Sequence, residues 1–89
     1  MQGLTGMDIA QVRALARQLD VEADDICREV TTMTARLRDV DWVGPDRDRF
    51  VGEWESHVAG LRRVADGLRD ASGRAHRYAD MQEWASRTP

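Results

Sequence analysis

Apolar residues recur every three or four positions over 12–40 and again over 50–78. Charged and polar residues fill the positions between them. This periodicity is typical of amphipathic α-helices and unlike the alternation of a half-buried strand. We therefore predict one helix over about 7–41 and a second helix over about 46–85.

A single strong breaker separates the two runs, where Gly44 is followed by Pro45. Gly44 can adopt a positive φ that other residues avoid. Pro45 suits the first helical position, because its missing N–H would be unpaired there. We predict a turn over 42–45 and an all-α, antiparallel two-helix hairpin that forms one domain over 1–89.

The apolar stripe of the second helix is wider than a contact with one sister helix requires, because a flanking row from Val51 to Ala79 lies beside the main seam. A chain of 89 residues with Cys27 as its only cysteine cannot add an internal disulfide to a small core. We therefore expect the hairpin to dimerise into a four-helix bundle. The residues predicted for the core of the hairpin or dimer are Leu15, Leu19, Ile26, Val30, Met33, Leu37, Phe50, Trp54, Leu61, Val64 and Leu68.

Charge and hydropathy exclude two classes of partner. The net charge of −3 argues against a general polyanion binder, and Asp66 and Asp70 lie among the arginines of the second helix at intrahelical spacing. We predict no nucleic-acid partner. The chain has no run of 18 apolar residues, so we predict no stable membrane insertion.

The sequence predicts no catalytic residue, metal site or cofactor, and the protein is expected not to be an enzyme. Its two histidines, His57 and His76, lie far apart along the second helix. The acidic residues over 20–25 point around a helix rather than to one side. Cys27 beside Ile26 is interpreted as a small, partly buried filler.

Trp42, beside the turn, has two compatible interpretations. It can close the open end of the hairpin by packing on Val40, Val43 or Phe50. It can also serve as a rigid aromatic recognition residue, since tryptophan is the type most enriched in binding hot spots.

The centre of the chain resembles the WXG family of small, early-secretory-antigen-like proteins that type VII (ESX) systems secrete. The resemblance rests on Trp42-Val43-Gly44, on the helical halves that flank it and on the small size. It covers nearly the whole chain. The residues similar to the actinobacterial version of the family are Gly44, Pro45, Asp46, Arg49, Phe50 and Trp54.

The resemblance implies a hairpin that forms a homodimer, or a heterodimer with a related hairpin protein, and recognition by the type VII secretion ATPase. It implies synthesis in the cytoplasm and export to the medium or cell surface without a cleaved signal peptide. Such substrates carry a Tyr-x-x-x-Asp/Glu element after the second helix, close to the partner's Trp-x-Gly turn. Here Tyr78 is followed four positions later by Gln82, with Glu83 one place late and Asp80 two places early.

Two functions are therefore predicted. The first is a substrate or co-secreted partner of a type VII system, acting through dimerisation and recognition, with Trp42 and Gly44 as the turn motif and Tyr78, Gln82 and Glu83 as a degenerate export signal. The alternative, favoured by Gln82, is an intracellular helical adaptor or chaperone for a larger effector that is not itself exported.

Overall fold

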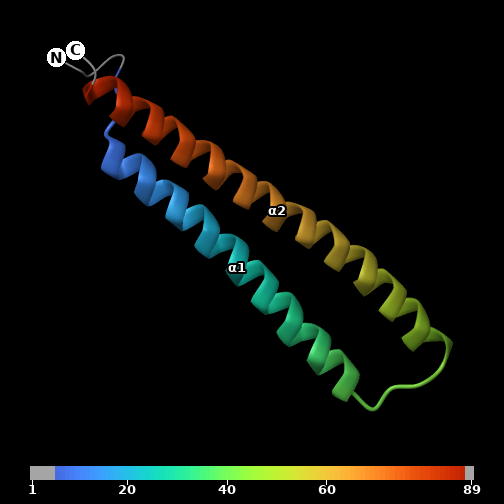
Figure 1. The fold of residues 1–89 in the computed structure, drawn as a ribbon. Helices are drawn as coiled ribbons and strands as arrows, with labels where there is room; N and C mark the ends of the chain where they lie inside the picture. The colour runs from blue at the N-terminus through green and yellow to red at the C-terminus, as the bar shows by residue number, and fades with distance from the viewer. Residues whose placement is uncertain (1–5, 88–89) are drawn as a thin grey trace.

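The computed structural model describes residues 6–87, so residues 1–5 and 88–89 of the predicted domain lie outside the described part. Two helices, α1 (Ile9–Asp39) and α2 (Pro45–Arg87), lie antiparallel and side by side (Figure 1). The prediction of an all-α helical hairpin is confirmed, and residues 6–87 contain no strand. The molecule is a rod with extents of 69 × 19 × 17 Å.

The ends of α1 follow from local chemistry. Asp8 is the N-cap: its backbone is extended, and its carboxylate accepts a hydrogen bond of 3.0 Å from the Gln11 backbone N–H. Arg36 and Arg38 lie in the last turn, where the helix dipole favours positive charge. Val40 then adopts an extended conformation and ends the helix. The helix expected over 7–41 thus spans Ile9–Asp39.

The start of α2 depends on a glycine and a proline. Gly44 has a φ of 113°, and its carbonyl accepts the first helical hydrogen bond from the Asp48 backbone N–H at 3.1 Å. Pro45 follows as the first helical residue, and Asp46 and Asp48 lie in the first turn. The helix expected over about 46–85 spans Pro45–Arg87.

The core between the helices is made of small side chains. The buried residues occur at steps of seven, one row on each helix: Ala16, Ala23 and Val30 on α1, and Ala65, Ser72 and Ala79 on α2. We call these six residues the small-residue core. Small side chains let two helix backbones approach closely, but they bury little apolar area, so this core stabilises the hairpin only modestly.

The large apolar residues predicted for the core lie beside this row. Val30 alone among them is buried. Half-buried are Leu19, Ile26, Leu37, Trp54, Leu61 and Leu68. Leu15, Met33, Phe50 and Val64 are between 42% and 56% exposed. The single hairpin therefore leaves most of its large apolar side chains in contact with solvent, and their part in a dimer core stays a prediction.

Candidate functional site

Two adjoining grooves open between the helices on one side of the hairpin. The groove nearer the turn has a volume of about 190 Å³ and is lined by Met33, Arg36, Leu37, Val40, Phe50 and Trp54. The next groove has a volume of about 140 Å³ and is lined by Ile26, Glu29, Val30, Met33, Trp54 and Leu61. Met33 and Trp54 belong to both, so the two grooves form one continuous, mainly apolar depression.

The same face continues from these grooves toward the open end of the hairpin. Residues seven apart lie on nearly the same side of a helix. Leu19 thus continues the row of Ile26 and Met33, while Leu68 continues the row of Trp54 and Leu61. We define the apolar side as Val12, Leu15, Leu19, Ile26, Met33 and Val40 of α1 with Phe50, Trp54, Leu61, Val64, Leu68 and Tyr78 of α2.

The opposite side of the hairpin, which we call the polar side, carries the ion pairs between the helices. Near the open end, Arg13 of α1 donates hydrogen bonds to Asp80 at 2.8 Å and to Glu83 at 3.1 Å. These bonds, that to Asp80 first, raise the pKa of the Arg13 guanidinium above its usual value. Arg13 therefore joins the start of α1 to the end of α2.

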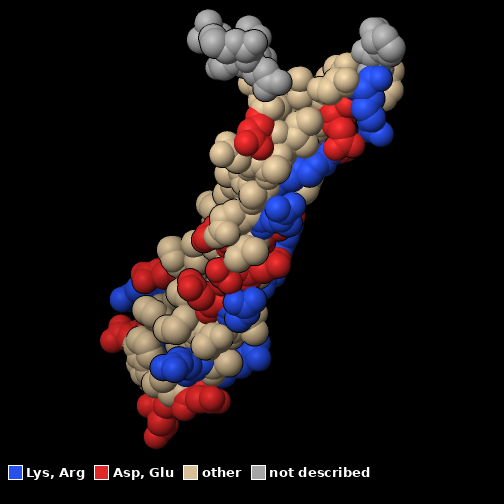
Figure 2. Space-filling view, turned by 90° about the vertical axis from the view of Figure 1, so that its left-hand side faces the viewer, with Lys and Arg blue, Asp and Glu red and all other residues tan. Residues whose placement is uncertain are grey.

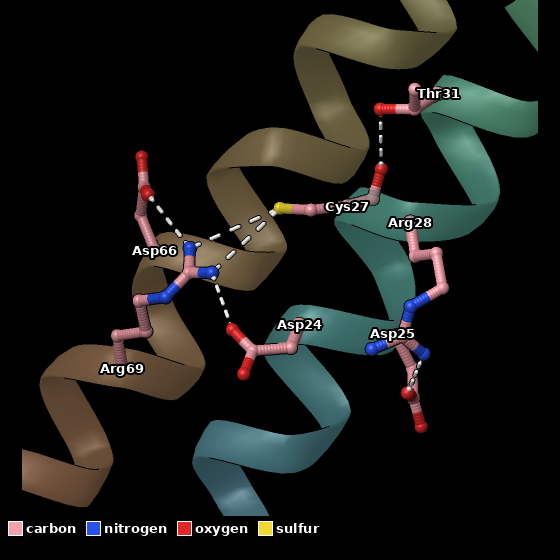
Figure 3. A network of polar contacts seen from close by, with 7 residues as sticks. All are labelled: Asp24, Asp25, Cys27, Arg28, Thr31, Asp66 and Arg69. Atoms are coloured by element: carbon pink, nitrogen blue, oxygen red, sulfur yellow. Dashed lines mark hydrogen bonds and ion pairs between the residues drawn. The ribbon is translucent and has the colours of Figure 1, made fainter.

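A second cluster lies at mid-length (Figure 3). Arg69 of α2 donates a hydrogen bond to Asp24 at 2.9 Å, and both of its terminal nitrogens lie 3.9 Å from the Cys27 sulfur. Asp66, one turn away on α2, is 3.9 Å from the same guanidinium. The hydrogen bond to Asp24, followed by that to Cys27, raises the pKa of Arg69. Cys27 is a free, half-buried thiol.

Charged residues are unevenly distributed over the surface (Figure 2). In the upper half of that view, mostly uncharged residues form a tan band that carries one acidic patch on its left and is bordered on the right by arginines and acidic residues. The lower end, where the turn lies, finishes in acidic side chains. Asp41 and Asp46, on either side of the turn, are both exposed. A partner that covers the tan band would meet few charges there.

Trp42 both packs and remains accessible. Its ring lies 5.5 Å from the Phe50 ring, centre to centre, and it is 37% exposed. Val43 beside it is 87% exposed. The positive φ of Gly44 turns the chain immediately after this pair. The turn thus presents the exposed part of the Trp42 ring to solvent, while the Phe50 ring packs against Trp42.

The residues predicted to form a degenerate export signal lie at the other end of the rod. Tyr78 is 58% exposed and Gln82 is half-buried. Glu83 accepts hydrogen bonds from Arg13 and, at 3.1 Å, from Arg87. The carboxylate nearest the expected position is therefore engaged within the chain. Sequence spacing alone could not show this, because Arg13 comes from the other helix.

The described part of the chain shows no cluster of side chains typical of a catalytic or metal-binding site. Residues 6–87 hold no group of three His, Cys, Asp or Glu side chains able to bind a metal ion. His57 is exposed and lies 5.6 Å from the Trp54 ring, centre to centre. Neither helix, over the residues described, is long and apolar enough to cross a membrane.

Comparison with models of protein families, with curated proteins and with solved structures found no match to this chain. The resemblance to the WXG family therefore rests on the residues of the turn and on the helical halves that flank it.

Proposed function

We propose that this protein is a small, non-enzymatic hairpin that a type VII (ESX) secretion system exports, as a substrate or as a co-secreted partner. It acts through dimerisation and through recognition by the secretion ATPase. The observation that carries the proposal is the turn itself. Trp42 and Gly44 stand at the tip of two long antiparallel helices, in the arrangement that the resemblance implies.

The geometry of the turn supports a role for both residues. Gly44 has a φ that side-chain-bearing residues rarely adopt, so another residue there would strain the turn. Trp42 is held by Phe50 yet keeps a third of its surface accessible. A supported, partly exposed aromatic side chain is well suited to recognition, because little conformational entropy is lost when it binds.

The apolar side supports dimerisation. Soluble monomers rarely expose continuous apolar surface on this scale, and such surface usually marks an interaction site. Leu15, Val64 and Tyr78 are each more than half exposed in the single hairpin. Because the small-residue core buries little apolar area, a partner on this side is the main remaining source of stability.

Export is the direct test. In a host that carries the secretion system, we expect the protein in the culture filtrate of the parent strain and not in that of a strain lacking the secretion ATPase. Trp42→Ala should reduce export. Val21→Ala, at an exposed residue away from the turn, is the matched control and should leave export unchanged. Equal amounts outside both strains would contradict the proposal.

A second candidate function is an intracellular adaptor or chaperone for a larger effector. It is favoured by Gln82 at the expected acidic position and by the ion pairs that Glu83 makes with Arg13 and Arg87. On this alternative, the protein stays in the cell and co-purifies with an effector encoded beside it. Cell fractionation after co-expression with that neighbour separates the two functions.

A further inference from the structure

We propose that Arg13 is an autoinhibitory residue: by binding Asp80 and Glu83, it keeps the acidic part of the predicted export signal from the secretion ATPase until the open end of the hairpin separates. This inference rests on the proposed function and names a regulation of its recognition site. Support comes from the ion pairs, burial and charges of the open end, where α1 begins beside the last turns of α2 (Figure 1).

The buried core of the hairpin stops short of the open end. Ala16 of α1 and Ala79 of α2 are the last buried residues in that direction, and the described residues beyond them, 6–15 and 80–87, are all half-buried or exposed. The first two turns of α1 therefore bury little apolar area against α2. Segments with few buried contacts open locally more readily than the rest of a fold.

Arg13 joins the two helices across this weakly packed end. Its guanidinium contacts the Asp80 carboxylate at 2.8 Å and the Glu83 carboxylate at 3.1 Å. Its side chain is 27% exposed, less than that of either partner. Ion pairs that remain accessible to solvent contribute little to stability. A cationic group of a binding partner can therefore replace Arg13 at these carboxylates.

The two carboxylates also line a surface depression at the end of α2. It has a volume of about 740 Å³, and its lining residues are Asp80, Met81, Glu83, Trp84, Ala85 and Arg87. Met81 and Trp84 are both more than 60% exposed. A surface of the ATPase that is apolar and carries a cationic group would complement this depression in both apolar contact and charge. That cationic group reaches the carboxylates only when Arg13 is displaced.

Separation of the open end would remove Arg13 and leave the acidic residues on an intact helix. The second partner of Glu83 is Arg87, at 3.1 Å and four positions later on α2, so this ion pair stays within the helix. Asp80 forms its ion pair with Arg13 of the other helix. Arg13 therefore couples the separation of α1 from α2 to the accessibility of both carboxylates.

This coupling sets the direction of the expected effect. If the ATPase binds the separated form, the measured dissociation constant is the intrinsic constant divided by the fraction of molecules that are separated. Loss of the Arg13 ion pairs raises that fraction. Binding should therefore become tighter when Arg13 is removed, although the substitution destabilises the open end.

Arg13→Gln tests the inference in binding of the full chain to the purified secretion ATPase, measured by titration calorimetry at low salt. We expect a dissociation constant about three- to tenfold lower than that of the parent. Arg17→Gln, at an exposed arginine one turn further along α1, makes the same charge change and should leave binding unchanged. Arg13→Lys keeps the positive charge and should stay close to the parent. Binding of Arg13→Gln equal to or weaker than that of the parent would overturn the inference.

A disulfide across the open end tests the need for separation, in a Cys27→Ser background. Ile9 continues the row of Ala16 by seven residues, and Ser86 continues that of Ala79, so both lie on the faces where the helices meet. Ile9→Cys with Ser86→Cys should weaken ATPase binding at least about tenfold when oxidised, relative to the same protein reduced. Equal binding in the two redox states would overturn the inference, and so would failure of the disulfide to form, because the ends would then not be held together.

The outcomes separate this inference from the proposed function. Binding of the parent to the ATPase that changes neither with Arg13→Gln nor with the disulfide overturns autoinhibition and leaves the proposed function standing. Absence of binding by the parent and by every variant, together with absence of the protein from the culture filtrate, contradicts the proposed function and this inference with it.

Discussion

The indole N–H of Trp54 donates a hydrogen bond of 3.0 Å to the hydroxyl of Thr34, and so joins α2 to α1 at a partly buried point near the turn. It is a direct polar contact between the helices that involves no charged group. Trp54 also lines both grooves of the apolar side. The bond therefore fixes the position of the largest side chain of the proposed interface.

Thr34→Val should destabilise the hairpin by about 1 kcal/mol, because valine keeps the shape of threonine but leaves the Trp54 N–H without its acceptor. Urea denaturation at one fixed protein concentration measures the change, since dimerisation would make stability depend on concentration. Thr32→Val, at an exposed position on the same helix, is the control. Equal effects of the two substitutions would contradict a role for this hydrogen bond.

Gly44→Ala should destabilise the protein by about 1–3 kcal/mol, because a residue with a Cβ is strained at a φ of 113°. Space is not the cause, since a Cβ at this position would meet nothing within 4 Å. Gly52→Ala is the opposite case. It lies inside α2 with equally open surroundings, so alanine there should stabilise by about 1 kcal/mol. Thermal unfolding of the two variants should shift in opposite directions.

Ala23→Leu should destabilise the hairpin by about 1–3 kcal/mol, because Ala23 is 0% exposed in the small-residue core and a larger side chain would push the helices apart. Ala35→Leu places the same side chain on an exposed position of α1 and should change stability little. Chemical denaturation compares them. A harmless Ala23→Leu would show that the helices are not closely packed there.

Arg13→Gln should loosen the end of α2, because it removes the contacts with Asp80 and Glu83. Hydrogen exchange should show faster exchange in the last turns of α2 and no change at the turn, and added salt should reduce the difference between variant and parent. Because hydrogen bonding raises the Arg13 pKa, its stabilising effect is present below the usual arginine pKa and is lost only at higher, strongly alkaline pH. The effect of the substitution should therefore be the same at pH 6 and pH 9.

The helices and the turn could be predicted from local information. Steps of three and four between apolar residues define each helix, and Gly44 with Pro45 defines the break between them. The core could not be assigned in the same way. Several adjacent rows on each helix are apolar, and the prediction favoured the rows with the largest side chains. Hydrophobicity ranks Leu15 and Phe50 above Ala23 and Ser72, although the latter two are buried between the helices.

The candidate site could also be predicted only in part, because the sequence indicates the turn residues but not the contacts between the helices. Trp42 and Gly44 attract attention in the sequence, because they lie at the single strong break between the two apolar runs. The engagement of Glu83 by Arg13 joins residues 70 positions apart, and no local pattern indicates it. Whether an acidic residue is accessible depends on what the other helix presents, and that depends on the register of the hairpin.

Local patterns in the sequence are enough to predict two amphipathic helices, their single turn and the width of their apolar stripes. The row of each stripe that faces the sister helix depends on how the two helices pack together. Close approach of two helix backbones favours the smallest side chains, so alanines and Ser72 lie between the helices. Most of the large apolar residues predicted for the core lie beside them on the apolar side. The spacing of apolar residues shows which face of a helix is apolar. The packing of α1 against α2 then decides which residues of that face contact the other helix.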